Sequence, residues 1–180
     1  MVTQSALETI QNRRTTRRFT SQEVSDAQVR TILAAGMSAP SVMNRRPWHF
    51  LVVREAATKK AVAGAMRLHP YVQQAPVLVV ALADTSVSPG WRLDLAAAVE
   101  NINLAAAGLG LGGAWIGAPD VAFEAQTEEM LRTLFSLPDN LKLFAFVALG
   151  YPAETRAGHE PDTYLVSTRI HYESWEGLKF

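Results

Sequence analysis

The chain of 180 residues contains no cysteine. This absence excludes disulfide bonds, a thiolate nucleophile and cysteine metal ligands, and it suits a cytoplasmic protein, which is the location we expect. Long apolar runs are also lacking. The longest, residues 75–83, is far below the ~20 residues that span a bilayer, so we expect no membrane partner. The four histidines show no metal-ligand spacing, and we expect no metal site.

Charge is balanced overall but unevenly placed. The chain has 17 basic residues (Lys and Arg) and 17 acidic ones, which gives no general attraction to nucleic acid. Residues 1–50 nevertheless hold seven arginines against three acids, a net charge of +4 that leaves −4 for the remainder. Any anion site is therefore predicted near the N-terminus.

Four of those arginines lie in one run, Arg13-Arg14-Thr15-Thr16-Arg17-Arg18. Guanidinium groups match phosphate oxygens in pairs, and threonine hydroxyls add short donors. On spacing alone, a phosphate site, a solvated basic surface and a nucleic-acid patch all stay open. Nucleic acid is disfavoured because no basic or aromatic series continues elsewhere.

The order of elements predicts a single α+β domain over residues 1–180. Capping boxes open helices after Ser5 and Ser25, the first with an apolar face of Leu7 and Ile10. The remaining predicted elements are strands over residues 48–53, 76–83, 114–117 and 141–149, and helices over residues 54–66, 92–107 and 124–135. Strands and helices do not alternate regularly, which favours α+β. The aromatic tail, residues 150–180, is expected to pack on another surface such as a partner subunit.

The glycines of Gly108–Gly113 (GLGLGG) invite a dinucleotide-binding interpretation. A Rossmann fingerprint follows a strand and precedes a helix, and here the order is reversed. We therefore predict a helix C-cap and a tight reversal.

Four segments in order resemble the nitroreductase family of flavin enzymes. They are Arg13–Phe19 (RRTTRRF), Ala39–Trp48 (APSVMNRRPW), Gly108–Gly117 (GLGLGGAWIG), and Leu137-Pro138 followed by Ala148–Pro152 (ALGYP). Each is weak alone, but the four together in this order and spacing are specific. The resemblance covers nearly the whole chain. It implies a central mixed, mainly antiparallel sheet flanked by helices, and FMN bound at a homodimer interface.

The resemblance also assigns residues. It implies that the FMN phosphate and ribityl chain are held by Arg13, Arg14, Thr15 and Arg17. It implies that the partner's flavin is reached by Pro40, Ser41 and Asn44. The stretch beside the flavin ring would be Ile116, Gly117 and Ala118, with a backbone N–H, that of Gly117, directed at N5. Glycine suits that place because a side chain would hold the backbone away from the ring.

The chain departs from the family at two places. Arg46 stands where the family has glutamine before the proline, and Thr163 stands where a tail arginine is expected. Of the remaining tail arginines, Arg156 ranks ahead of Arg169 as the residue that completes the phosphate site. We further expect His69 and Tyr71 to edge the pocket for the substrate.

These assignments predict an FMN-dependent oxidoreductase with NADH or NADPH as electron donor. Hydride would pass to flavin N5 and then, in a ping-pong cycle, to a nitroaromatic, quinone or similar small-molecule acceptor. The cofactor carries the chemistry, so no catalytic side chain is predicted. A non-catalytic flavin-binding protein, and a specialised dehydrogenase, dehalogenase or flavin-fragmenting enzyme on the same fold, stay open as alternatives.

Overall fold

The computed structural model describes residues 5–66, 70–117 and 125–175. Its helices are α1 (Ala6–Asn12), α2 (Asp26–Met37), α3 (Ala56–Ala65), α4 (Trp91–Gly108), α6 (Ala125–Leu134) and α7 (Pro161–Tyr164). Its strands are β1 (Trp48–Val53), β2 (Val77–Asp84), β3 (Gly112–Ile116) and β4 (Leu141–Gly150). Three short 3-10 helices cover Val42–Asn44, Pro70–Gln74 and Ser167–Arg169. The predicted helices and strands are confirmed, with ends that differ by a few residues.

The four strands form one sheet in the order β1-β2-β4-β3, and every neighbouring pair is antiparallel. The α+β prediction is therefore confirmed. Among the described residues, parallel pairing is limited to one isolated bridge, between Thr15 and Gly113. This bridge extends the β3 edge with a segment from the N-terminal region.

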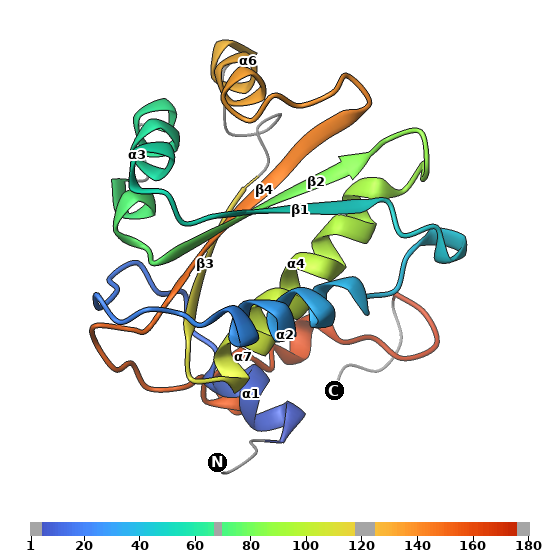
Figure 1. The fold of residues 1–180 in the computed structure, drawn as a ribbon. Helices are drawn as coiled ribbons and strands as arrows, with labels where there is room; N and C mark the ends of the chain where they lie inside the picture. The colour runs from blue at the N-terminus through green and yellow to red at the C-terminus, as the bar shows by residue number, and fades with distance from the viewer. Residues whose placement is uncertain (1–4, 67–69, 118–124, 176–180) are drawn as a thin grey trace.

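Helices cover both faces of the sheet. Figure 1 shows α2 and α4 against one face and α3 and α6 against the other. The side chains of β2 divide accordingly: Val77, Val79, Ala81 and Ala83 pack with α2 and α4, while Leu78, Val80 and Leu82 pack with α3 and α6. A central strand with two covered faces is apolar throughout rather than alternating, which explains the β-branched run in the sequence.

Helix α4 packs closely on α2. A Cβ atom on Gly36 would lie 2.8 Å from Ile102 Cγ1, so the absence of a side chain permits this approach. Asn101 adds a hydrogen bond from its Nδ2 to the Ala35 carbonyl, at 3.0 Å. No helix of the described residues is long and apolar enough to cross a membrane.

Helix α1 begins with the predicted capping box. The Ser5 hydroxyl accepts from the Glu8 backbone N–H, and the Glu8 carboxylate accepts from the Ser5 N–H at 2.7 Å. The apolar face predicted for this helix is not buried within the described chain, since Leu7 is 71% and Ile10 52% exposed. The buried residue of α1 is Thr9, which faces α4 at Gly108.

Lys59 is a buried cation that joins α3 to the start of β2. Its side chain is 7% exposed, and its Nζ donates to the carbonyl oxygens of Ala75 at 2.6 Å and Pro76 at 3.5 Å. Burial lowers the pKa of Lys59 from its usual value, Arg54 lowers it further, and Glu55 opposes both. The lysine satisfies two carbonyls that precede the central strand.

Lys59→Met should destabilise the fold, because it keeps the apolar stem but leaves those carbonyls without a donor. The expected loss of unfolding free energy is about 1–3 kcal/mol, the usual cost of unsatisfied buried polar groups. Urea unfolding followed by circular dichroism measures it. Lys60→Met is the matched control, because Lys60 is exposed on the same helix, and equal stability of the two variants would contradict this role.

Candidate functional site

The arginine run leaves α1 and lies along the β3 edge. The Thr16 N–H donates to the Gly113 carbonyl at 3.0 Å. Further on, the run is paired with the chain after β4: Thr20 N–H donates to the Tyr151 carbonyl, and Ala153 N–H donates to the Arg18 carbonyl, both at 2.9 Å. The backbone of the run is thus held by the fold, which fixes the positions from which its side chains extend.

Glycines allow the arginine run to lie this close to β3. A Cβ on Gly112 would overlap the Thr16 side chain, and a Cβ on Gly113 would lie 2.6 Å from Asn103 Oδ1. Gly110 has a φ of +76°, in the left-handed region that favours glycine at the end of a helix. The predicted C-cap and reversal are therefore present. The same glycines also form the surface on which the arginine run lies.

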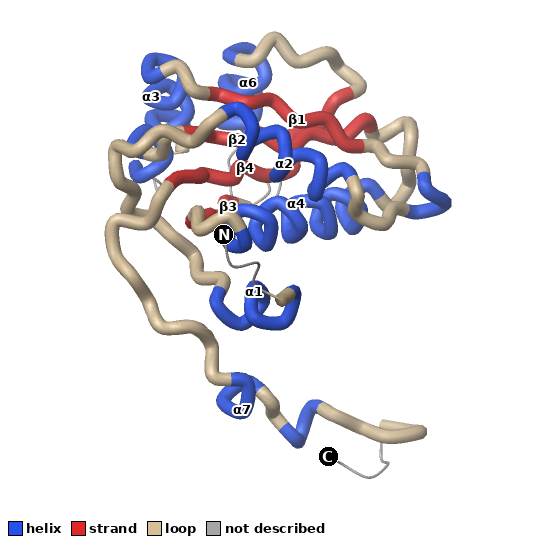
Figure 2. The backbone as a smooth tube through the Cα atoms, turned by 60° about the horizontal axis from the view of Figure 1, so that its bottom comes forward, coloured by secondary structure: helices blue, strands red, loops and turns tan. Residues whose placement is uncertain are grey.

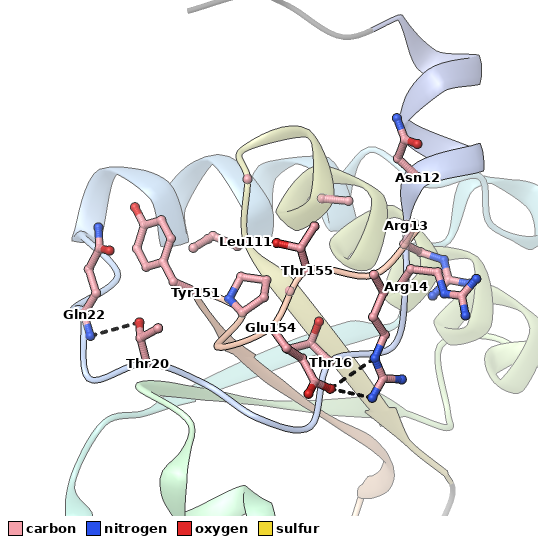
Figure 3. Close-up of a pocket in the computed structure, with 15 residues that line it drawn as sticks. Asn12, Arg13, Arg14, Thr16, Thr20, Gln22, Leu111, Tyr151, Glu154 and Thr155 are labelled. Atoms are coloured by element: carbon pink, nitrogen blue, oxygen red, sulfur yellow. Dashed lines mark hydrogen bonds and ion pairs between the residues drawn. The ribbon is translucent and has the colours of Figure 1, made fainter. Parts of the chain in front are cut away.

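A cavity of about 450 Å³ opens between the arginine run, the end of α4 and the chain after β4. This volume is within the usual range of small-molecule sites. Figure 3 shows Arg13 and Arg14 together at one end and Gln22 and Tyr151 at the other. Arg156 also lines it, so three of the predicted cofactor residues share one cavity.

Arg13 and Arg156 differ in how strongly each is already paired with an acidic side chain. Arg13 Nε lies 3.6 Å from Glu100 Oε1, a partly exposed pair of the kind that contributes little to stability. Arg156 instead donates two hydrogen bonds to Glu154 Oε1, at 2.6 Å and 3.1 Å. This bonding lowers the pKa of the Glu154 carboxyl. Arg13 is therefore more available to an anion than Arg156 is.

Thr15 and Arg17 do not line the cavity. The Arg17 guanidinium carbon lies 5.9 Å from the ring centroid of Tyr71, in the 3-10 helix Pro70–Gln74. The structure thus brings Arg17 and Tyr71 together. His69 lies outside the described residues.

The loop that contains Pro40, Ser41 and Asn44 is held by a buried carboxylate of α4. Asp94 is 3% exposed, and its Oδ1 accepts from the Val42 N–H at 2.8 Å. Its Oδ2 accepts from the Ser88 hydroxyl at 2.6 Å. The loop is therefore anchored at the first turn of α4.

Arg46 organises the same loop from within. Its N–H donates to the Ser41 hydroxyl at 3.0 Å, and its Nε donates to Asn44 Oδ1 at 2.8 Å. Met43, Asn44 and Arg46 have φ angles of +50°, +57° and +50°, which are costly for residues with side chains. The arginine in place of the family's glutamine thus contacts two of the predicted cofactor residues, in a strained turn.

The two predicted sets of cofactor-binding residues, the arginine run and the Pro40–Asn44 loop, lie far apart within one chain. The Pro40–Asn44 loop is anchored at Asp94, in the first turn of α4, whereas the arginine run lies on the glycines after its last turn. Asp94 and Gly108 are 14 residues apart in α4, about 21 Å along the helix. Within one chain, the two sets therefore lie towards opposite ends of α4.

The end of β3 offers backbone rather than side chains. Ile116 is 2% exposed and packs in the core under α3 and α6, so its backbone alone is accessible to a ligand. A Cβ on Gly117 would meet no atom of the described residues within 4 Å, so no described part of the chain fills the space beside it. Ala118 lies outside the described residues.

Some residues of this region were not found from the sequence. Asp94 looks like an ordinary acid in the first turn of a helix, and nothing in the sequence signals its contact with Val42. Glu154 pairs with both Arg156 and Arg18. In the sequence, the only signal for these pairs is that Glu154 and Arg156 are two positions apart. His159, which meets Arg14, is separated from it by too much chain for a local pattern to reveal.

Comparison with known proteins gives consistent results. The sequence profile described as the nitroreductase family matches residues 10–85 and 65–151. An Archaeoglobus fulgidus protein, provisionally named NADH dehydrogenase/NAD(P)H nitroreductase, is 36% identical over 176 residues, covering 96% of this chain and 99% of that one. The Thermus thermophilus NADH dehydrogenase is 31% identical over 172 residues, covering 79% and 84%.

Solved structures extend the likeness to the fold. A Desulfovibrio desulfuricans protein, provisionally named a nitroreductase and crystallised with FMN, has a TM-score of 0.75 and 32% identity, covering 91% of this chain and 95% of that one. A similarity at this level over nearly the full length shows a common fold.

Asp94→Ala should loosen the Pro40–Asn44 loop, because Val42 N–H and the Ser88 hydroxyl lose their acceptor. We expect a loss of about 1–3 kcal/mol in unfolding free energy and faster hydrogen exchange at the Val42 amide. Asp94→Asn is the control, since it keeps an oxygen for Val42. Slow exchange at Val42 in the alanine variant would show that the loop does not depend on this carboxylate.

Proposed function

The chain belongs to the nitroreductase family, and from this premise we propose that it is an FMN-dependent oxidoreductase. It takes hydride from NADH or NADPH and passes it to an electron-poor small molecule such as a nitroaromatic or a quinone. FMN, when bound, supplies the hydride-accepting and hydride-donating chemistry. The names of the relatives, which include NAD(P)H nitroreductase and NADH dehydrogenase, and the FMN complex of the Desulfovibrio protein support this assignment.

The observation that carries the proposal is the arrangement along β3. The cationic run is fixed beside Gly113, and open space lies beside Gly117. Four residues of extended strand separate them, on the order of 13 Å. A ligand with an anion at one end and a flat ring at the other can lie along this strand, and FMN has this shape and charge.

Each residue then has a stated task. Arg13 and Arg14 donate to the phosphate, and the Thr15 hydroxyl adds a donor for the ribityl chain. Arg17, held near Tyr71, would place positive charge beside the ring and would stabilise negative charge there. The Gly117 backbone approaches the ring because it carries no side chain.

We further propose a homodimer, in which Pro40, Ser41 and Asn44 of each chain complete the site of the other. The exposed apolar surface supports it. Figure 2 shows the tail leaving the body of the molecule next to α1. The exposed apolar residues there are Leu7, Ile10, Tyr164, Leu165, Val166, Tyr172 and Trp175. A second copy that covers this surface removes it from water.

The first test is an absorbance spectrum of the purified protein, followed by anaerobic titration with NADH and NADPH. We expect flavin bands near those of free FMN and their loss on addition of one or both nucleotides. A protein that stays colourless after incubation with FMN would refute flavin binding. Flavin bands that persist with both nucleotides would favour the non-catalytic flavin-binding alternative.

Arg13→Ala should weaken FMN binding, because it removes a charge-assisted hydrogen bond worth roughly 1.5–3 kcal/mol. That is about a ten- to hundredfold rise in Kd, measurable by fluorescence titration of the apoprotein. Arg18→Ala is the matched control, because the Arg18 side chain is 76% exposed and pairs with Glu154. Equal FMN affinities for the two variants would show that Arg13 does not bind the phosphate.

Negative charge introduced on the exposed apolar face of α1 tests the proposed dimer. Leu7→Glu combined with Ile10→Glu should give a monomer of 19.7 kDa in sedimentation equilibrium, where the wild type gives twice that mass, because burying two carboxylates is costly. FMN affinity should fall with it. Lys60→Glu, on the exposed side of α3, should leave the mass unchanged, and a dimeric double variant would exclude α1 from the interface.

A further inference from the structure

Beyond its pairing with Arg18, the tail also lies against the end of α1 and the start of the arginine run, at Gly158 and His159. The His159 N–H donates to the Gln11 carbonyl, at the end of α1, over 2.7 Å. A Cβ on Gly158 would lie 2.5 Å from Asn12 Oδ1 and 3.2 Å from the Gln11 carbonyl oxygen. A side chain at position 158 would therefore crowd this approach, and the backbone bond sets His159 directly beside the run.

The His159 ring faces a guanidinium. Its Nδ1 lies 3.5 Å from Arg14 Nη1, and the ring of Tyr164 meets it edge-on with centroids 4.8 Å apart. An arginine side chain donates hydrogen bonds and accepts none. The contact is therefore favourable when Nδ1 presents its lone pair, with the imidazole neutral and its proton on Nε2.

The other tail candidate is engaged elsewhere. Arg156 donates twice to Glu154, which also pairs with Arg18 over 3.5 Å. Of the tail groups in the described residues, His159 is the one in side-chain contact with Arg14. The tail thus gives the site an acceptor that orients an arginine, where a basic residue was expected.

We propose that His159 is a positioning residue for a phosphate monoester. By accepting one N–H of Arg14 it fixes the plane of that guanidinium, and the remaining N–H groups of Arg14 then point to an anion in the cavity that Arg13 and Arg14 line. Pre-orientation of a flexible cation lowers the entropic cost of binding. The role rests on the proposed function, because that monoester is the phosphate of FMN.

The test compares FMN with riboflavin, which lacks the phosphate, in titrations of the apoprotein. His159→Leu should weaken FMN binding about two- to tenfold, the equivalent of one net hydrogen bond, and leave riboflavin binding unchanged. His159→Asn should restore FMN binding, because Asn Oδ1 occupies the place of Nδ1. Arg18→Ala, the exposed control used above, should leave the ratio of the two affinities as in the wild type.

Each other outcome has a definite meaning. If His159→Leu weakens both flavins equally, the histidine serves only the fold, and if it weakens neither, it has no role in binding. Both results overturn the proposal while the proposed function survives. A wild-type protein that binds neither flavin overturns both.

Discussion

The site depends on backbone contact between the arginine run and two glycines of β3. Arginine side chains are long and flexible, and four within six residues repel one another in an unrestrained chain. Here the Thr16–Gly113 hydrogen bond and the pairing of Arg18 and Thr20 with the chain after β4 hold the backbone. The repulsion is thus offset by the fold rather than by a ligand. Without glycine at position 112, the Thr16 side chain could not come this close.

The same contact links distant parts of the sequence. It joins the end of α1, the reversal after α4 and the tail into one wall of the cavity. The rigidity behind it comes from the doubly covered sheet, whose central strand β2 is buried along nearly its whole length. A flexible cationic segment becomes a defined site because it is attached to the edge of this rigid sheet.

Local patterns in the sequence predicted the elements well, because each carried a local cause. The Ser5 and Ser25 capping boxes and the buried run of β2 involve neighbours in the chain. Contacts between distant residues carried no such signal: Asp94 reaches back over 52 positions to Val42, and Arg14 and His159 are 145 positions apart. The resemblance supplied the candidate residues, but only the coordinates show that Arg13 and Arg14 line the cavity and that Thr15 and Arg17 do not.

The placement of the arginine run and the Pro40–Asn44 loop at opposite ends of α4 has a genetic consequence. In the proposed dimer, the arginine run of each chain serves one cofactor and its Pro40–Asn44 loop serves the other. A chain damaged in the run and a chain damaged in the loop, produced together, form mixed dimers in which one site carries both defects and the other carries none. Two inactive alleles would then complement each other, with at most one working site in each mixed dimer.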